Sequence, residues 1–185
     1  MERIEAADLV RLFEAWRNLF AEQRDFLISL DGKVGDSDLG ITMSKSFAAA
    51  YDAVAAEAEG APLSKLLRTA GVIMAKTAPS TMGTLTATGF LRGSKALENE
   101  AAIDTRACAA FWRAFADGVA ERGKAKLGDK TLLDVLDPIA RSLEQSAQAG
   151  AALAPALDAA VDAAGKALED TKSMVAQHGK AAAFQ

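Results

Sequence analysis

The amino-acid sequence predicts an all-α fold of about eight helices, and three observations support this expectation. Apolar residues recur every three or four positions in segment after segment, as on one face of an α-helix. No segment alternates apolar and polar residues with the period of a strand over a useful length. Glycine and proline separate periodic segments, as in Gly60-Ala61-Pro62, which would end one helix and begin the next.

The expected helices follow one another along the whole chain. The first, residues 7–30, carries Leu9, Phe13 and Trp16 at helical spacing, and we assign Trp16 to the core. The others are expected at about 41–58, from 63 to before Pro79, from the following loop to Leu97, at 105–123, around 135–143, at 155–168 and at 170–177. Gly179 stands where the glycine after a helix is expected.

Length and composition favour a single domain. The chain has 185 residues, half of them apolar and a quarter charged, which is ordinary globular composition and enough to bury a core. The net charge of −4 and the pI near 5.1 argue against nucleic acid or an anionic membrane surface as the main partner. Any phosphate binding must then be local, through metal ions and backbone amides.

The cysteine content and the N-terminal residues favour a cytoplasmic protein. Cys108 is the single cysteine and lies in the apolar pattern of a helix, so we expect a buried packing residue and no disulfide framework. The start of the chain, with Glu2, Glu5 and Asp8, lacks the basic and apolar regions of a signal peptide. No apolar run approaches the length of a membrane span.

Residues 31–43, which lie between the first two expected helices, carry the most chemical information. They place Asp31, Asp36 and Asp38 within eight positions. Carboxylates crowded on a short loop repel one another unless a hard cation such as Mg²⁺ neutralises them. Gly40-Ile41-Thr42 then opens a helix, whose free amide groups and dipole favour a phosphate. The stretch therefore predicts a site for a divalent cation and a phosphate.

Spacing alone leaves a second interpretation of this stretch open, an acidic surface turn whose aspartates cap helices. An EF-hand is excluded by the order of its residues. If the loop is numbered from Asp36, Gly40 falls at the fifth position and Phe47 occupies the place of the bidentate glutamate.

Two later loops are polar and precede helices. Residues 78–86 are small and hydroxylated and could wrap a nucleotide, or they could be a plain connection capped by Ser80 or Thr81. Residues 124–134 contain Gly128-Asp129-Lys130-Thr131, which is no P-loop because the Gly-x4-Gly-Lys frame and the preceding strand are missing. For His178, the only histidine, we expect a helix end or a solvent position rather than a ligand role.

Taken in order, the loops at 31–43, 79–85, 123–134 and 178–180 resemble those of the nucleotide-binding L subunit, or L domain, of the dihydroxyacetone kinases. The resemblance covers essentially the whole chain. Its most specific parts are Gly35-Asp36-x-Asp38-x-Gly40-x-x-Met43 after Leu30-Asp31, and Arg122-Gly123-Lys124 followed by Gly128-Asp129-Lys130-Thr131-x-x-Asp134.

The resemblance implies that residues 1–185 form one nucleotide-binding domain, an antiparallel, closed helical barrel whose loops at one end hold ATP or ADP with two Mg²⁺ ions. By the same resemblance, Asp31, Asp36 and Asp38 are the metal ligands. It further implies contacts to phosphate from Leu39, Gly40, Ile41 and Thr42, contacts along the nucleotide from Ser80, Thr81, Met82 and Gly83, adenine contacts from Gly123 and Leu132, and Lys180 in place of a usual arginine.

The implied chemistry is transfer of a γ-phosphoryl group to a hydroxyl of dihydroxyacetone or a similar short ketose. In that family a separate K subunit or domain holds the sugar through a histidine that this chain lacks. We therefore expect this chain to bind nucleotide without phosphorylating sugar alone, and we assign it no catalytic residue. The phosphoryl source, either ATP or a phosphotransferase-type carrier fed from phosphoenolpyruvate, stays open, as does a homodimeric state.

The sequence departs from the family pattern at several positions. Leu39 replaces a usual histidine, Thr42 a usual asparagine and Lys180 an arginine, while residues 79–83 differ from a glycine-rich loop and the family's C-terminal lid with its Asp-x-Gly contact is missing. Three alternatives therefore stay open. The acceptor could be another ketose such as a tetrulose, the chain could be a non-catalytic regulatory or scaffold module, or its apolar interior could hold a lipid or fatty acid.

Overall fold

The computed structural model describes residues 2–183, and within this range the chain is all-helical, as predicted. Its helices are α1 (Ala6–Glu22), α2 (Arg24–Asp31), α3 (Leu39–Glu57), α4 (Leu63–Thr77), α5 (Thr81–Ala96), α6 (Thr105–Gly123), α7 (Leu133–Gln148), α8 (Leu153–Asp170) and the short 3-10 helices η1 (Thr171–Ser173) and η2 (Lys180–Ala183). The described residues include no strand, only an isolated bridge between Ile4 and Ile103. None of the described helices is long and apolar enough to cross a membrane.

The first expected helix, residues 7–30, is wrong in one respect, because the chain bends at Gln23 and forms two helices. Gln23 has φ −85° and ψ 3°, outside regular helical values. The bend lays α2 against the start of α3, where a Cβ on Gly40 would lie only 2.0 Å from the carbonyl oxygen of Arg24. The absence of a side chain at Gly40 therefore permits this close backbone contact.

The last expected helix, residues 170–177, is also wrong. Helix α8 extends to Asp170, and only η1 continues the turn before residues 174–179 become irregular. Hydroxyls of Thr171 and Ser173 donate hydrogen bonds to the carbonyls of Leu168 and Asp170, which lets side chains replace helical backbone bonds at this end. The described residues therefore contain eight α-helices, as predicted, because the first expected helix is divided into two and the last expected helix is not formed.

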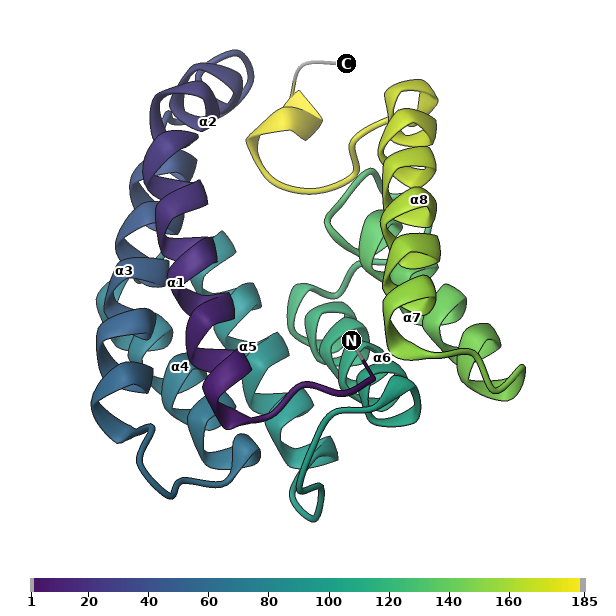
Figure 1. Ribbon diagram of the computed structural model, residues 1–185. Helices are drawn as coiled ribbons and strands as arrows, with labels where there is room; N and C mark the ends of the chain where they lie inside the picture. The colour runs from purple at the N-terminus through teal and green to yellow at the C-terminus, as the bar shows by residue number, and fades with distance from the viewer. Residues whose placement is uncertain (1, 184–185) are drawn as a thin grey trace.

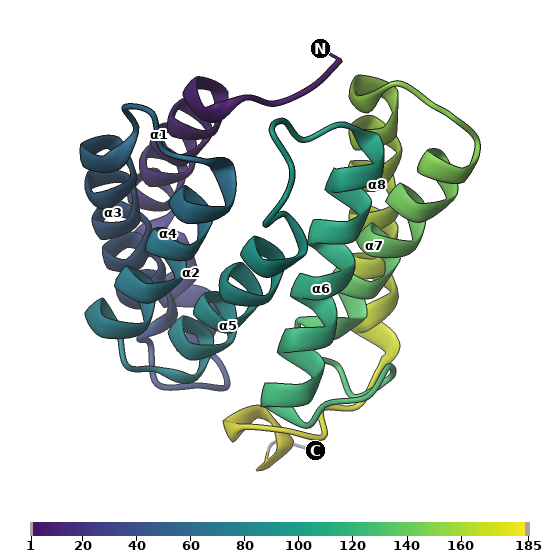
Figure 2. The same ribbon diagram turned by 90° about the horizontal axis from the view of Figure 1, so that it is seen from below.

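The helices pack in a consecutive, antiparallel order. Contacts join α1 to α3, and then each helix to the next from α3 to α8, while α2 also packs on α3 (Figures 1 and 2). The interior carries a run of touching aromatic rings contributed by α1, α3, α5 and α6: Phe13, Trp16, Phe47, Phe90, Phe111 and Phe115. Trp16 and the buried Cys108 are packing residues, as predicted.

Glycines on α5 allow α6 to approach closely. A Cβ on Gly89 would lie 2.3 Å from the ring of Phe115, and one on Gly93 would lie 2.4 Å from the ring of Phe111. Two aromatic rings thus occupy the space that these glycines leave free.

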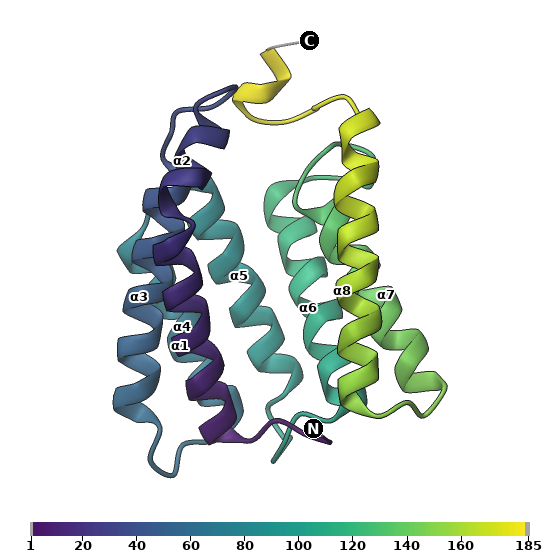
Figure 3. The same ribbon diagram turned by 45° about the horizontal axis from the view of Figure 1, so that its top comes forward.

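The antiparallel arrangement brings four loops to one end of the molecule. The loop between α2 and α3, the loop before α5, the loop between α6 and α7, and the segment after α8 all lie at the end that is uppermost in Figures 1 and 3. The Ile4–Ile103 bridge joins the segments that precede α1 and α6, at the opposite end of these antiparallel helices. These are the four loops that the sequence singled out.

Candidate nucleotide and metal site

The loop between α2 and α3 is built around the carboxylate of Asp31. Its Oδ2 accepts hydrogen bonds from the backbone N–H of Asp38 at 2.9 Å and of Leu39 at 3.2 Å. Asp31 thereby caps the N-terminus of α3. The residue at the N-cap position, Asp38, makes no capping bond with its own side chain. A Cβ on Gly35 would lie 2.0 Å from Asp31 Oδ1, so a larger residue would displace this carboxylate.

Three carboxylates converge in this loop. One oxygen each from Asp31, Asp36 and Asp38 lies within 4.8 Å of the others. Burial, followed by the negative charges of Asp36 and Asp31, raises the pKa of the Asp38 carboxyl, whereas the hydrogen bond from Lys180 lowers the pKa of Asp36. A set of hard oxygen donors whose mutual repulsion only Lys180 partly offsets suits a hard divalent cation. Because Asp31 caps α3, the alternative interpretation of this stretch, aspartates that cap helices, is correct for Asp31.

The first turn of α3 lies directly after the carboxylates. Gly40 and Thr42 are buried, whereas Leu39 and Ile41 are half-buried. The N–H of Thr42 donates to the carbonyl of Asp38 at 2.8 Å, which starts the helix. The structure thus brings these four residues beside the metal loop, and their contact with phosphate stays a prediction.

The loop before α5 has a structural cap. Ser80 Oγ accepts the N–H of Gly83 at 3.0 Å, so the expected capping by Ser80 is confirmed. A Cβ on Gly83 would lie 2.2 Å from the carbonyl oxygen of Ala78, which explains the glycine. Thr81 is exposed and Met82 half-buried at the start of the helix, where both could meet a ligand.

The end of α6 and the start of α7 complete the loop cluster. A Cβ on Gly123 would lie 3.3 Å from the side chain of Leu85 on α5, so these two expected regions are neighbours. Helix α6 ends at Gly123, as expected from the sequence, and the residue after it, Lys124, adopts the left-handed conformation with φ 54°. Leu132 is half-buried immediately before α7.

Asp134 organises the α6–α7 loop, a role that the sequence interpretation missed. Its side chain is buried, and its two oxygens accept the N–H of Gly128 at 2.6 Å and of Thr131 at 2.7 Å. The hydroxyl of Thr131 in turn accepts the N–H of Leu133 at 3.2 Å. The Thr131-x-x-Asp134 spacing is a capping-box pattern, so the sequence did carry a signal for this role.

The segment after α8 reaches two other loops. Lys180 Nζ lies 2.6 Å from Asp36 Oδ2, although the two residues are 144 positions apart. His178 is exposed, as predicted, but its Nε2 lies 2.9 Å from Asp129 Oδ2, a partner that spacing did not indicate. Lys180, a predicted binding residue, thus bonds through its side chain to Asp36, a predicted metal ligand in a distant loop.

Comparisons with known proteins bear on this cluster of loops. The model of the DAK2 domain matches residues 33–185, most of the chain. The chain belongs to the DAK2 domain family. It is 31% identical over 164 residues, 89% of its length and 78% of the relative's, to the ADP-binding subunit DhaL of the PEP-dependent dihydroxyacetone kinase of Escherichia coli. A Listeria innocua DhaL subunit is 32% identical over 90% of this chain and 79% of its own length.

Relatives of other named activities are longer than the DAK2 region that they share with this chain. The L-erythrulose kinase of Pectobacterium atrosepticum is 33% identical over 82% of this chain, which is 26% of the kinase. The family therefore includes both separate subunits named as ADP-binding and large kinases of which the DAK2 region is one part.

A mostly apolar hollow of about 600 Å³ lies between α1, α6 and α8, and it opens to solvent beside the exposed Val161. Its walls are mostly apolar side chains of these helices, including Leu9, Leu12, Trp16, Phe111, Trp112 and Leu157. This apolar space is where the lipid or fatty acid of the third sequence-based alternative would have to lie.

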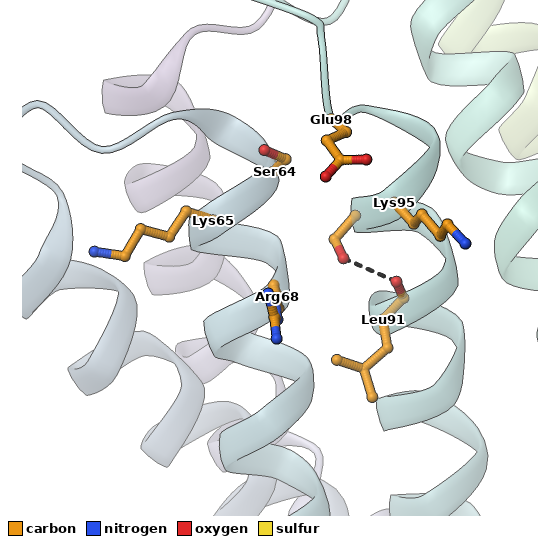
Figure 4. A pocket seen from close by; sticks show the side chains of 7 residues that line it. Ser64, Lys65, Arg68, Leu91, Lys95 and Glu98 are labelled. Atoms are coloured by element: carbon orange, nitrogen blue, oxygen red, sulfur yellow. Dashed lines mark hydrogen bonds between the residues drawn. The ribbon is translucent and has the colours of Figure 1, made fainter.

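A second hollow, between α4 and α5, is unrelated to the carboxylate loop. Figure 4 shows Arg68 central in it, while Lys65 and Lys95 extend to opposite sides. The first half of α4 and the end of α5 line it, so it lies toward the opposite end of these helices. Because its cations diverge, it does not form a convergent anion site.

Proposed function

We propose that this chain is the nucleotide-binding and Mg²⁺-binding subunit of a dihydroxyacetone-type kinase, a phosphotransferase that acts together with a sugar-binding K subunit. The observation that carries the proposal is the convergence of Asp31, Asp36 and Asp38 within 4.8 Å at the start of α3. Its support comes from the names of the two DhaL relatives, which describe ADP-binding subunits.

Two Mg²⁺ ions would be held by Asp31, Asp36 and Asp38, and when bound they would offset the negative charge of the phosphoryl group being transferred. The chain's own contribution is to fix these ligands before the cations arrive. Asp31 is held by two backbone N–H groups, and Gly35 leaves room for its carboxylate. Lys180 brings a compact positive charge to the same loop, where it would approach the phosphates.

The nucleotide, ADP or ATP, would lie across the loop cluster. Its phosphates would meet the first turn of α3, its ribose and phosphates the start of α5, and its adenine the region between α6 and α7. The residues proposed to meet the phosphates in α3 are Leu39, Gly40, Ile41 and Thr42. Those at the start of α5 are Ser80, Thr81, Met82 and Gly83, and those beside the adenine are Gly123 and Leu132. The neighbouring positions of Gly123 and α5 support this path.

The finer features of the fold belong to the same proposal. Residues 1–185 would act as one domain whose helices close into a barrel around the apolar hollow, with α1 and α8 on either side of it. The consecutive antiparallel packing of the helices supports the antiparallel order of this barrel.

The proposed partners follow from the family resemblance, which assigns the sugar to a separate K subunit. The chain would dock its loop end on a K subunit that binds dihydroxyacetone, and it would receive phosphoryl groups from ATP or from a phosphotransferase-type carrier. The words "PEP-dependent" in the names of both DhaL relatives favour the carrier. We place this assembly in the cytoplasm, and its oligomeric state, monomer or homodimer, is a matter for measurement.

Calorimetry with ADP and Mg²⁺ tests the binding site directly. The double variant Asp36→Ala with Asp38→Ala should bind ADP–Mg²⁺ at least about 100-fold more weakly than wild type, because ligand loss costs more than loss of supporting bonds. Asp158→Ala with Asp162→Ala removes the same charge from the exposed face of α8 and should bind normally. Equal binding by wild type and the loop variant would refute the proposed site.

A coupled assay tests the reaction and the acceptor. The chain, ATP or a charged phosphoryl carrier, and a K subunit should together yield dihydroxyacetone phosphate, whereas the chain alone should not. A product found only with erythrulose would assign a tetrulose acceptor. Normal ADP–Mg²⁺ binding with no phosphorylated ketose from any combination would favour the regulatory or scaffold module.

A further inference from the structure

The segment from residue 174 to residue 180 crosses the loop end of the molecule, and we call it the strap. It leaves α8 and η1, passes the loop between α6 and α7, and reaches the carboxylate loop after α2 (Figures 1 and 3). These two loops belong to opposite ends of the consecutive helix order. The strap therefore connects parts of the proposed site that come from distant helices.

One end of the strap is fixed to Asp129 and its neighbour. The backbone carbonyl of Asp129 accepts the N–H of Gln177 at 3.0 Å, and Asp129 Oδ2 lies 2.9 Å from His178 Nε2. Lys130 Nζ donates to the carbonyl of Met174 at 3.1 Å. Three bonds thus anchor the strap within the span of a few residues.

The loop that receives these bonds is itself rigidly built. Asp129 Oδ2 accepts the N–H of Lys126 at 2.8 Å, and the N–H of Asp129 donates to the carbonyl of Lys126 at 3.2 Å. The buried carboxylate of Asp134 holds the same loop through Gly128 and Thr131. Asp129 therefore presents its carboxylate to the strap from a fixed position, with a side chain only 20% exposed.

The other end of the strap holds one residue, Lys180, against Asp36 at 2.6 Å. The Lys180 side chain is 60% exposed and has four rotatable bonds. Its exposed ion pair with Asp36 therefore cannot by itself keep this chain segment in place. Gly179, with φ +66°, makes the turn that separates His178 from Lys180. The position of Lys180 therefore depends on the anchored His178 two residues earlier.

We propose that Asp129 and His178 form a joint that positions Lys180 over the carboxylate loop, so that the strap is a wall of the nucleotide site. Asp129 and His178 are positioning residues, since they act through Lys180 and need not touch the ligand. This inference rests on the proposed function, because it concerns the same ADP–Mg²⁺ site.

Calorimetry with ADP and Mg²⁺ on wild type and three variants tests the joint. His178→Ala and Lys180→Ala should each weaken ADP–Mg²⁺ binding about tenfold, as expected for loss of a supporting bond. The double variant should bind no more weakly than Lys180→Ala alone, since both changes remove the same positioned charge. His178→Gln, whose amide can donate to Asp129, should recover most of the affinity.

Two controls separate this role from a purely structural one. Lys172→Ala removes an equal charge from η1, outside the strap, and should bind as wild type. The thermal midpoint of His178→Ala without nucleotide should match that of wild type, since the His178 side chain is 41% exposed and buries little surface in its pair with Asp129.

Each other result has a distinct meaning. If wild type binds ADP–Mg²⁺ and His178→Ala binds it equally well, or if the losses of the two single variants add, the joint is refuted and the proposed function stands. If wild type binds no ADP–Mg²⁺, the proposed function fails and takes the joint with it.

Discussion

Two groups of carboxylates in this protein differ in how far neighbouring cations balance their negative charge. Between α6 and α7, Arg113 forms a bidentate pair with Glu144 at 2.8 and 2.9 Å and bonds Asp137 at 2.8 Å. Arg141 lies 2.6 Å from the other oxygen of Asp137, and Asp117 lies 3.8 Å from Arg113. Two arginines therefore form ion pairs with three acidic side chains. In the carboxylate loop three aspartates converge and Lys180 pairs with one of them.

The difference separates a structural ion network from a ligand site. Planar guanidinium groups match carboxylates in pairs, so the α6–α7 network satisfies its oxygens internally and joins two helices. The loop aspartates are crowded and two of them, Asp36 and Asp38, are exposed. Partial desolvation of its carboxyl group, followed by the neighbouring negative charges, raises the pKa of Asp38. Backbone bonds nevertheless hold them together, and this is the arrangement that a cation would complete.

The largest expected effect is stabilisation by Mg²⁺. At a Mg²⁺ concentration 100 times its Kd, wild type should gain about 2.7 kcal/mol of unfolding free energy. For a chain of this size that corresponds to a rise of roughly 5–11 °C in the thermal midpoint. A thermal unfolding series over Mg²⁺ concentration at constant ionic strength measures it.

The two carboxylate groups supply a matched comparison for this experiment. Asp36→Ala with Asp38→Ala should abolish the Mg²⁺-dependent rise. Asp117→Ala with Glu144→Ala removes the same charge from the α6–α7 network and should keep the rise, from a lower starting midpoint. A rise that survives in the first variant and vanishes in the second would reverse the assignment of the two groups.

The next effect concerns stability without metal. Arg113→Ala should lower the unfolding free energy by about 2 kcal/mol, since Glu144 loses its bidentate partner and the buried Asp137 loses one of its two arginines. Lys180→Ala should leave the unfolding free energy unchanged, because its pair with Asp36 is exposed on both sides. Urea unfolding of both variants checks this, and equal destabilisation would contradict the distinction.

Much of the fold was predictable because it depends on local sequence. Helical spacing of apolar residues, Gly60-Ala61-Pro62 and the cap at Ser80 set most helix limits within a few residues. The two errors, at Gln23 and after Asp170, arise from contacts outside the local window. The bend at Gln23 follows from packing against Gly40, and residues after Asp170 bond to the α6–α7 loop instead of continuing the helix.

The candidate site was predictable only where its residues are close in sequence or where a family resemblance ordered them. Asp31, Asp36 and Asp38 were found because they share one short loop, and the structure brings them together. The pairing of Lys180 with Asp36 and of His178 with Asp129 joins residues far apart in the chain. No periodicity or spacing encodes such contacts, since they arise from the path of the chain across the loop end.

A smaller effect should follow when the geometry of the loop is changed without its charge. Gly35→Ala would place a Cβ 2.0 Å from Asp31 Oδ1 and 2.8 Å from its carbonyl oxygen, so the carboxylate must move. We expect about tenfold weaker ADP–Mg²⁺ binding by calorimetry. Gly165→Ala in α8, with nothing within 4 Å, is the control and should bind normally. Unchanged binding by Gly35→Ala would show that the placement of Asp31 is unimportant.

The smallest effect is a pH dependence of the α6–α7 network. The hydrogen bond from Arg113 lowers the pKa of Glu144 below its ordinary 4.5, so the folded protein binds this proton more weakly than the unfolded chain. The pair therefore stabilises the fold above pH 4.5, and its contribution disappears as the pH falls through the lowered pKa. Because Glu144 is 37% exposed, we expect less than about 1 kcal/mol.

Urea unfolding at a series of pH values detects this contribution as a difference between variants. Stability of wild type should fall more steeply with decreasing pH below 4.5 than that of Glu144→Gln, which lacks the titrating group. Glu98→Gln, at an exposed position without an ion pair among the described residues, should follow wild type. Parallel curves for wild type and Glu144→Gln would mean that the bidentate pair is as weak as an ordinary surface ion pair, and the contrast between the two carboxylate groups would then rest on metal binding alone.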